Sequence, residues 1–236
     1  MTGAATFSYS GYVYDQETGT GTTLLQGATT DSAYYVALDG GRVLENAGTF
    51  TVNAASGYGV FYLGYNQYGS VGGGTIQNDS GATFDFQSAS TVYAGSSAAS
   101  GAPYTGTLGF TNAGTLEQTV TTGLTDIQVA LTNTGTVSVQ TGTLKFDGGG
   151  TSSAAGSFAV SSGATLDFNS GAYTISGGTF TNAGEVQVSG GAVTLAAAET
   201  FGGLLEIDSG TLALGANAVT AASLTQTGGT IDARAS

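Results

Sequence analysis

The sequence predicts an all-β fold: a right-handed parallel β-helix (β-solenoid) with three short strands in each of about 8 to 10 coils. Apolar and small polar residues alternate along most of the chain, which places the apolar side chains on one face of an extended backbone. A nine-residue pattern with fixed Asn and Gly positions recurs. The 236 residues include 41 Gly and a single Pro, so turns are plentiful and interruptions of a strand ladder are rare.

The recurrent pattern reads apolar-x-Asn-x-Gly-Thr-apolar-x-apolar. Four copies follow it, with Glu for Thr in the last and Gln at the final apolar position of the second: Leu44 to Val52, Phe110 to Gln118, Leu131 to Val139 and Phe180 to Val188. Looser copies run from Ile76 to Phe86, Val160 to Phe168, Ile207 to Leu214 and Leu224 to Ala233. Copies are separated by at least about 20 residues with a variable excess, which is typical of a solenoid coil that carries insertions.

The same positions predict how the coils stack. We align the copies on the apolar residue after Gly-Thr and expect one interior column: Phe50, Phe84, Leu116, Val137, Leu166, Val186, Leu212 and Ile231. An up-and-down barrel or a sandwich is the competing fold. Tight hairpins favour Asn-Gly as adjacent residues, whereas here one residue separates them, and this favours stacked coils.

We expect one solenoid over residues 1–236 with two unlike halves. Residues 1–105 form a Tyr-rich half that holds eleven of the twelve tyrosines, and residues 106–236 form a plainer, more regular half. The first 40 residues fit the repeat loosely and supply one or two coils. The main insertions are residues 56–74 and 93–106.

Composition and charge exclude several classes of function. The net charge is −13 with three cations, so the basic surface that nucleic acids or anionic lipids require is missing. No apolar run approaches the roughly 20 residues of a membrane span, and we expect no direct membrane insertion. Without His or Cys, zinc, haem and iron–sulfur sites are not expected, and we predict no cofactor.

Acidic residues on outward positions are the first candidates for chemistry. Asp85, Glu117 and Asp167 are expected at the same outward position on different coils. Asp85 and Glu117 should lie one coil apart, close enough to raise the pKa of one of them or to share a calcium ion. The simpler interpretation is that sparse acids solvate the surface. Because a lyase also needs a cationic base and a charge stabiliser nearby, and only three cations are spread over the chain, we expect no enzymatic activity.

Tyrosines of the first long insertion are the second candidates. Tyr58, Tyr62, Tyr65 and Tyr68 could stack on sugar rings from a loop on a rigid scaffold. They could equally pack down over the coil and cover its core.

Asn and Thr columns are expected to be structural. Asn46, Asn112, Asn133 and Asn182 should form a corner ladder that satisfies turn backbone groups. The column of Thr residues that follow the corner Gly also raises ice binding, but within that column the paired Thr-x-Thr form occurs only at Thr49 and Thr51.

These Gly-Thr strands, with no cysteine and an acidic Gly/Thr/Ala-rich composition, resemble the passenger regions of bacterial autotransporters and related large repetitive surface adhesins. The resemblance implies a right-handed β-helix displayed outside the outer membrane, serving attachment, aggregation or biofilm formation. The chain lacks the signal peptide and the C-terminal barrel of that family, and we expect it to be part of a larger precursor located at the bacterial surface or outside the cell.

Two functional hypotheses follow. The first is a non-enzymatic extracellular rod, stalk or adhesin segment, whose partners are host or matrix glycans or neighbouring copies of itself. The alternative is a glycan-binding or glycan-cleaving β-helix that uses the Tyr-rich loops and the outward carboxylates. Because the repeat continues to Ala233, we also expect either that residue 236 is a cut within a longer solenoid or that the open C-terminal end stacks on another molecule, in which case head-to-tail contacts would build filaments.

Overall fold

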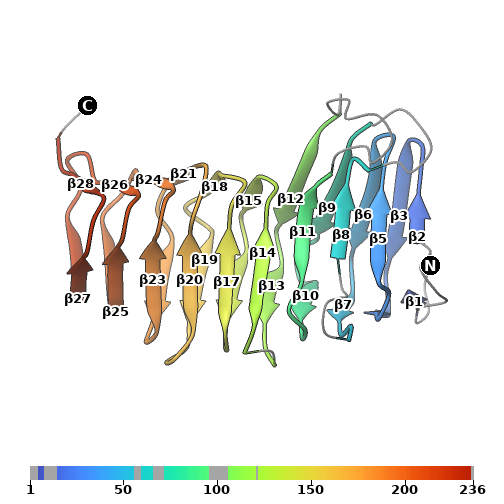
Figure 1. Cartoon of the computed structure of the whole chain (residues 1–236), viewed down its shortest axis with the longest axis horizontal. Helices are drawn as coiled ribbons and strands as arrows, with labels where there is room; N and C mark the ends of the chain where they lie inside the picture. The colour runs from blue at the N-terminus through green and yellow to red at the C-terminus, as the bar shows by residue number, and fades with distance from the viewer. Residues whose placement is uncertain are drawn as a thin grey trace.

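A computed structural model of the chain describes residues 5–7, 15–55, 60–65, 72–95, 106–120 and 122–234. Its elements lie side by side in a stack with the N-terminus at one end and the C-terminus at the other (Figure 1). All regular structure in the described residues is β, and it forms a β-solenoid of about nine turns with three strands per coil. The predicted fold class is therefore confirmed. Within these residues no helix is long and apolar enough to cross a membrane.

Three parallel sheets make up the faces of the solenoid, and from β1 to β24 the chain visits them in the same order in every coil; the last four strands alternate between the second and third sheets. Sheet A contains β1 (Ala5–Phe7), β4 (Ala28–Asp31), β7 (Thr49–Val52), β10 (Thr83–Phe86), β13 (Thr115–Gln118), β16 (Thr136–Val139), β19 (Ser157–Val160) and β22 (Thr179–Asn182). Sheet B contains β2 (Asp15–Glu17), β5 (Tyr35–Leu38), β8 (Val60–Leu63), β11 (Thr91–Ala94), β14 (Leu124–Ile127), β17 (Thr143–Phe146), β20 (Thr165–Phe168), β23 (Glu185–Val188), β25 (Glu199–Ile207) and β27 (Val219–Gln226). Sheet C contains β3 (Gly21–Leu25), β6 (Arg42–Asn46), β9 (Gly74–Asn78), β12 (Leu108–Asn112), β15 (Leu131–Asn133), β18 (Gly150–Ser152), β21 (Ala172–Ile175), β24 (Ala192–Leu195), β26 (Thr211–Ala213) and β28 (Thr230–Asp232).

The single interior column expected from the sequence is correct only for its first half. Phe50, Phe84, Leu116 and Val137 pair in register in sheet A. The next residues of that column are Phe158 and Phe180. Leu166 and Val186 belong instead to sheet B, and Leu212 and Ile231 to sheet C. The register was misassigned because the motif of a small turn followed by apolar-x-apolar occurs in all three sheets.

Glycine at the Asn-x-Gly-Thr corner is required by close packing between coils. A Cβ atom on Gly135 would lie 2.1 Å from the carbonyl oxygen of Gly114 in the preceding coil, and one on Gly114 would lie 2.3 Å from that of Ala82. Such contacts are sterically impossible, so these positions exclude every side chain. The Thr141-Gly142 turn differs, because Gly142 has a φ of 65°, which glycine adopts without strain.

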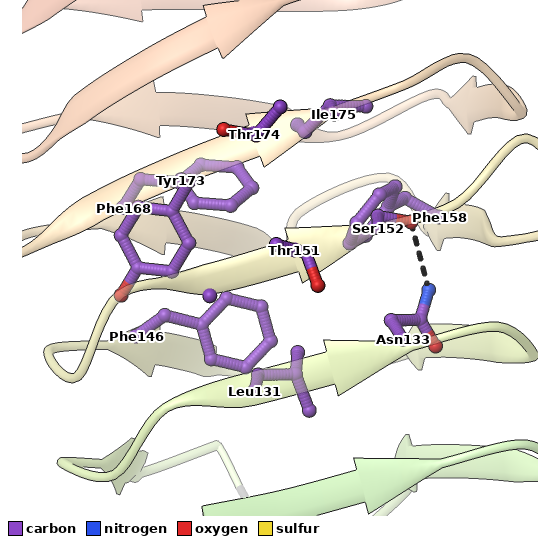
Figure 2. A pocket seen from close by; sticks show the side chains of 11 residues that line it. Leu131, Asn133, Phe146, Thr151, Ser152, Phe158, Phe168, Tyr173, Thr174 and Ile175 are labelled. Atoms are coloured by element: carbon purple, nitrogen blue, oxygen red, sulfur yellow. Dashed lines mark hydrogen bonds between the residues drawn. The ribbon is translucent and has the colours of Figure 1, made fainter.

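Apolar side chains from all three sheets fill the interior of the solenoid. Figure 2 shows the rings of Phe146, Phe168 and Tyr173 gathered above Leu131; the ring centroids of Phe168 and Tyr173 lie 5.0 Å apart. The space left among these side chains is about 10 Å³, no more than a single water molecule needs. This stretch of the interior is therefore a packed core and offers no ligand cavity.

Candidate functional site

A ladder of buried side-chain amides runs along the corner between sheets C and A. The Nδ2 atom of Asn46 donates to Oδ1 of Asn78, Asn78 donates to Asn112, and Asn112 donates to Asn133, each at 2.8 Å. Each of the first three amides also donates to a backbone carbonyl of the next coil, as Asn112 does to Thr136 at 3.0 Å. All four residues are almost completely buried. The ladder therefore holds coils together and presents no amide to a ligand.

The ladder differs from the expected one in two members. Asn182 lies elsewhere, at the end of β22 in sheet A, where its Oδ1 accepts a hydrogen bond from the backbone of Gly202 at 2.9 Å. Its copy of the motif is displaced by one sheet, for the same reason as the interior column. The sequence interpretation also missed Asn78, since two extra residues separate it from its Thr-Phe strand. Beyond Asn133 the column continues with Ser152, whose hydroxyl accepts from Asn133 (Figure 2).

Tyrosines gather on the outward face of sheet B. Tyr62 on β8 stacks on Tyr93 of β11, with ring centroids 5.1 Å apart and planes 12° from parallel. Tyr35 of β5 lies on the other side of Tyr62, at 5.4 Å, and Tyr65 contacts it at 5.1 Å. Tyr65 is buried. We call Tyr35, Tyr62, Tyr65 and Tyr93 the tyrosine row.

Each ring of the tyrosine row rests on a neighbour, so the face of Tyr62 is occupied by other aromatic rings. Sugar binding by stacking needs an accessible ring face. Tyr62 and Tyr65 thus follow the packing interpretation in the described part of the chain. Tyr58 and Tyr68 lie outside the described residues. Tyr35 and Tyr93 were not among the residues expected from the sequence. They lie beside Tyr62 because β5 and β11 are the strand neighbours of β8, a pairing that the sequence pattern did not reveal.

Asp85 and Glu117 are in-register neighbours in sheet A. Asp85 accepts hydrogen bonds from Gln87 and Thr119, both at 2.7 Å. Glu117 accepts one from Gln140 at 3.3 Å. Burial raises the pKa of Glu117, and the charge of Asp85 raises it further. The two carboxylates are close, but each already accepts hydrogen bonds from side chains of its own coil or of the next one.

Asp167 does not share the column of Asp85 and Glu117. It lies on β20 in sheet B, where it pairs in register with Lys145 and Gln187. Its Oδ1 accepts a hydrogen bond from Ser189 at 2.6 Å. Burial raises the pKa of Asp167, and the bond from Ser189 partly offsets that effect. The expectation of one acidic column is therefore wrong.

The sequence interpretation missed a charged cluster around Lys145. The Lys145 Nζ atom lies 3.2 Å from Asp126 Oδ2 and 2.9 Å from Asp147 Oδ2. Burial raises the pKa of Asp126; for Asp147 the hydrogen bonds from Lys145 and Asn169 outweigh burial and hold the pKa below its usual range. The sequence does contain the pattern that predicts this cluster: Asp126 lies one coil before Lys145, and Asp147 follows Lys145 by two residues.

Acid–base catalysis at the Lys145 cluster would need a carboxyl group that is free to exchange a proton with a substrate, and space for that substrate. Asn169 donates to Asp147 at 2.7 Å, and Gln128 donates to Asp126 at 2.9 Å. One atom, Asp126 Oδ1, is buried without a hydrogen-bond partner. Most polar atoms of the Lys145 cluster are therefore already bonded to other side chains of the same or the adjacent coil. Among the residues that the structure describes, no group of three or more His, Cys, Asp or Glu side chains is placed to hold a metal ion.

Asp31 is an acid on an inward position near the N-terminal end. It is completely buried beside Val52 in sheet A. Its Oδ1 accepts from the backbone of Ala33 at 2.8 Å, while its Oδ2 has no hydrogen-bond partner. Burial raises its pKa to about 7, and the nearby charge of Asp15 adds to the shift.

Comparisons with protein-family models, with curated proteins and with solved structures found no match to this chain.

Proposed function

We propose that the chain is a non-enzymatic structural rod, stalk or adhesin segment of a bacterial surface or secreted protein, made as part of a larger precursor. The observation that carries the proposal is the repeated coil-to-coil ladder around a packed interior. Three parallel sheets of eight to ten strands run along the stack, and the space left beside Phe146 and Tyr173 has room for one water at most. A stack of this kind sets a length and displays a surface.

The polar groups that could do chemistry are used between coils. Asp85 and Thr119, Asp126 and Lys145, and Asp167 and Ser189 each join different coils. Such contacts stabilise a stack, and a catalytic acid or base must instead reach a substrate. This distribution of bonds supports a structural role.

The alternative is a glycan-binding or glycan-cleaving β-helix, and the tyrosine row and the Lys145 cluster are the observations in its favour. Both lie on sheet B, and two carboxylates flank one cation there. Against it, the ring face of Tyr62 is occupied and the carboxylates already have partners. A polysaccharide would have to displace these contacts.

A panel of soluble polysaccharides separates the two functions. Incubation with the purified chain should release no new reducing ends, and Asp126→Asn or Asp147→Asn should change nothing. Cleavage that these variants abolish would contradict the proposal. Retardation in polysaccharide gels that is lost in Tyr93→Ala, and kept in the exposed control Thr111→Ala, would instead show glycan binding by the tyrosine row.

An adhesin or stalk role needs its own test. The chain, fused to an outer-membrane anchor, would be displayed on a non-adherent bacterium. Attachment or aggregation by the chain alone would identify an adhesin segment. If only a binding module placed at its tip confers attachment, the chain acts as a stalk.

A further inference from the structure

A buried carboxylate lies at a corner of the solenoid, at the start of β25. Glu199 is the first residue of that strand and is 5% exposed. Its Oε1 atom is buried and has no hydrogen-bond partner. Buried charges in proteins are normally paired with an opposite charge or bound to a metal ion. The surroundings of Glu199 therefore show which kind of partner this carboxylate can have.

Glu199 occupies a corner position that is glycine in the two coils before it. The ring of Phe201 lies against that of Phe180, with centroids 4.6 Å apart, and this contact places Glu199 beside Gly178. Gly178 in turn lies beside Gly156 of the preceding coil, where a Cβ atom on Gly178 would come within 2.0 Å of the Gly156 carbonyl oxygen. A long acidic side chain thus replaces a glycine that close packing requires one coil earlier.

A cavity of about 190 Å³ opens at this corner. Its lining consists of Glu199 and five neighbours: Gly178, Thr179, Phe180, Ala198 and Thr200. Glu199 is the only charged residue in the lining, and the other groups there that can bind a cation are hydroxyl and carbonyl oxygens. The volume has room for an ion together with several water molecules.

This cavity belongs to the body of the stack. Residues 219–221 of the next coil pair in register with residues 199–201, and Val219 pairs directly with Glu199. Glu199 therefore has a coil on each side along the stack. A further coil would stack on β27 and would not reach this corner.

The cations of the chain do not neutralise Glu199. The sequence has three cations and no His. Each of the three forms an ion pair with acids other than Glu199 in the described chain: Arg42, Lys145 and Arg234. A positively charged partner of this carboxylate must therefore come from solution.

We propose that the cavity binds a calcium ion, with the Glu199 carboxylate as its one charged ligand. Calcium is a hard cation that takes roughly six to eight oxygen ligands from carboxylates, carbonyls and water in flexible geometry. A single carboxylate supported by neutral oxygens gives weak binding, with a dissociation constant of about 10⁻⁴ to 10⁻³ M. The inference goes beyond the proposed function, because it assigns an ion to the rod whether or not the rod is a stalk.

Calorimetric titration of the chelator-treated chain with calcium chloride tests the site. The wild type should bind one ion in the range given above. Glu199→Gln keeps the shape of the side chain and should raise the dissociation constant at least about 10-fold. Glu206→Gln removes the same charge from an outward position of the same strand and is the matched control, which should bind as the wild type does. A wild type that binds no calcium, or binding that Glu199→Gln leaves unchanged, would overturn the proposal.

Ala198→Lys gives a second test that does not depend on the folding of Glu199→Gln. Ala198 lines the cavity and is exposed, so the new ammonium group can lie beside the Glu199 carboxylate and take the place of the ion. In about 20 mM calcium the melting temperature of the wild type should rise by about 5 °C, and that of Ala198→Lys should not respond. An equal rise in both proteins would mean general screening of the net charge of −13 and would contradict the site.

Discussion

The amides of Asn46, Asn78, Asn112 and Asn133 show how polar residues can occupy a solenoid corner without cost. The first three amides each donate to the amide of the next coil, and the last three each accept from the amide of the coil before. A buried polar group is unfavourable only when it is left unpaired. The ladder therefore also fixes the register, because a shifted coil would leave several amides unsatisfied at once.

Removing one rung tests this ladder. Asn112→Ala deprives the buried Asn133 Oδ1 of its donor and deletes the bond to the Thr136 carbonyl, so we expect a loss of about 2 to 4 kcal/mol in the free energy of unfolding. The adjacent, exposed Thr111→Ala should change it by less than about 0.5 kcal/mol. Urea unfolding measures both. Equal effects of the two variants would show that the ladder contributes nothing.

Asp31 predicts an unusual pH dependence. Its pKa is raised to about 7 in the folded chain, from an ordinary value of 3.8, so the folded state holds its proton where the unfolded state has released it. The stability that this proton supplies is present below pH 4 and is lost as the pH rises through 7. For a shift of this size the loss is on the order of 4 kcal/mol.

Asp31→Asn keeps the shape of the side chain and removes the titration. Its free energy of unfolding, followed from pH 4 to 8, should gain on the wild type steadily as the pH rises and level off above about 7. A constant difference between the two proteins across this range would mean that Asp31 titrates normally.

At the scale of the strand, burial in the interior decides stability. Val137 on β16 is completely buried and lies in register between Leu116 and Phe158. Val137→Asp places an unpaired charge there and should cost more than about 4 kcal/mol. Ser138→Asp, on the outward neighbour, is the control and should cost less than about 1 kcal/mol. If chemical denaturation shows a small loss for Val137→Asp, this residue does not point inward.

The sequence was sufficient to predict strands, coils and the Asn corner, because these depend on short spacings. It was insufficient to assign a strand to a sheet. Leu166 follows the same local pattern as Val137, and only the number of strands between them shows that Leu166 belongs to sheet B. The errors at Asn182 and Asp167 have this single origin. The tyrosine row was hidden for a related reason, since Tyr35, Tyr62 and Tyr93 meet only after insertions of different lengths.

Along the whole molecule, the outward face of sheet B carries different side chains in its first and its later coils. Tyrosines occupy the outward face in the first coils, and the Lys145 cluster with its acids follows in the later ones. The net charge of −13 favours solubility and opposes close lateral contact between rods.

The chain is a stack of equivalent coils, and the number of coils sets the length of the rod. Residues 115–135 form one coil, since Thr115 and Thr136 pair in register and Asn112 and Asn133 are 21 residues apart. Deleting residues 115–135 joins two equivalent positions of neighbouring coils and shortens the stack by one coil. Duplicating them lengthens the stack by one coil. The matched control deletes residues 126–135 alone, which breaks the register.

Small-angle X-ray scattering on these variants at low protein concentration measures the rod directly. We expect the maximum dimension to change by about 5 Å for each coil removed or added, at constant cross-section. The control should lose its compact cross-section. A coil deletion that unfolds the chain, or a length that does not follow the number of coils, would contradict the account.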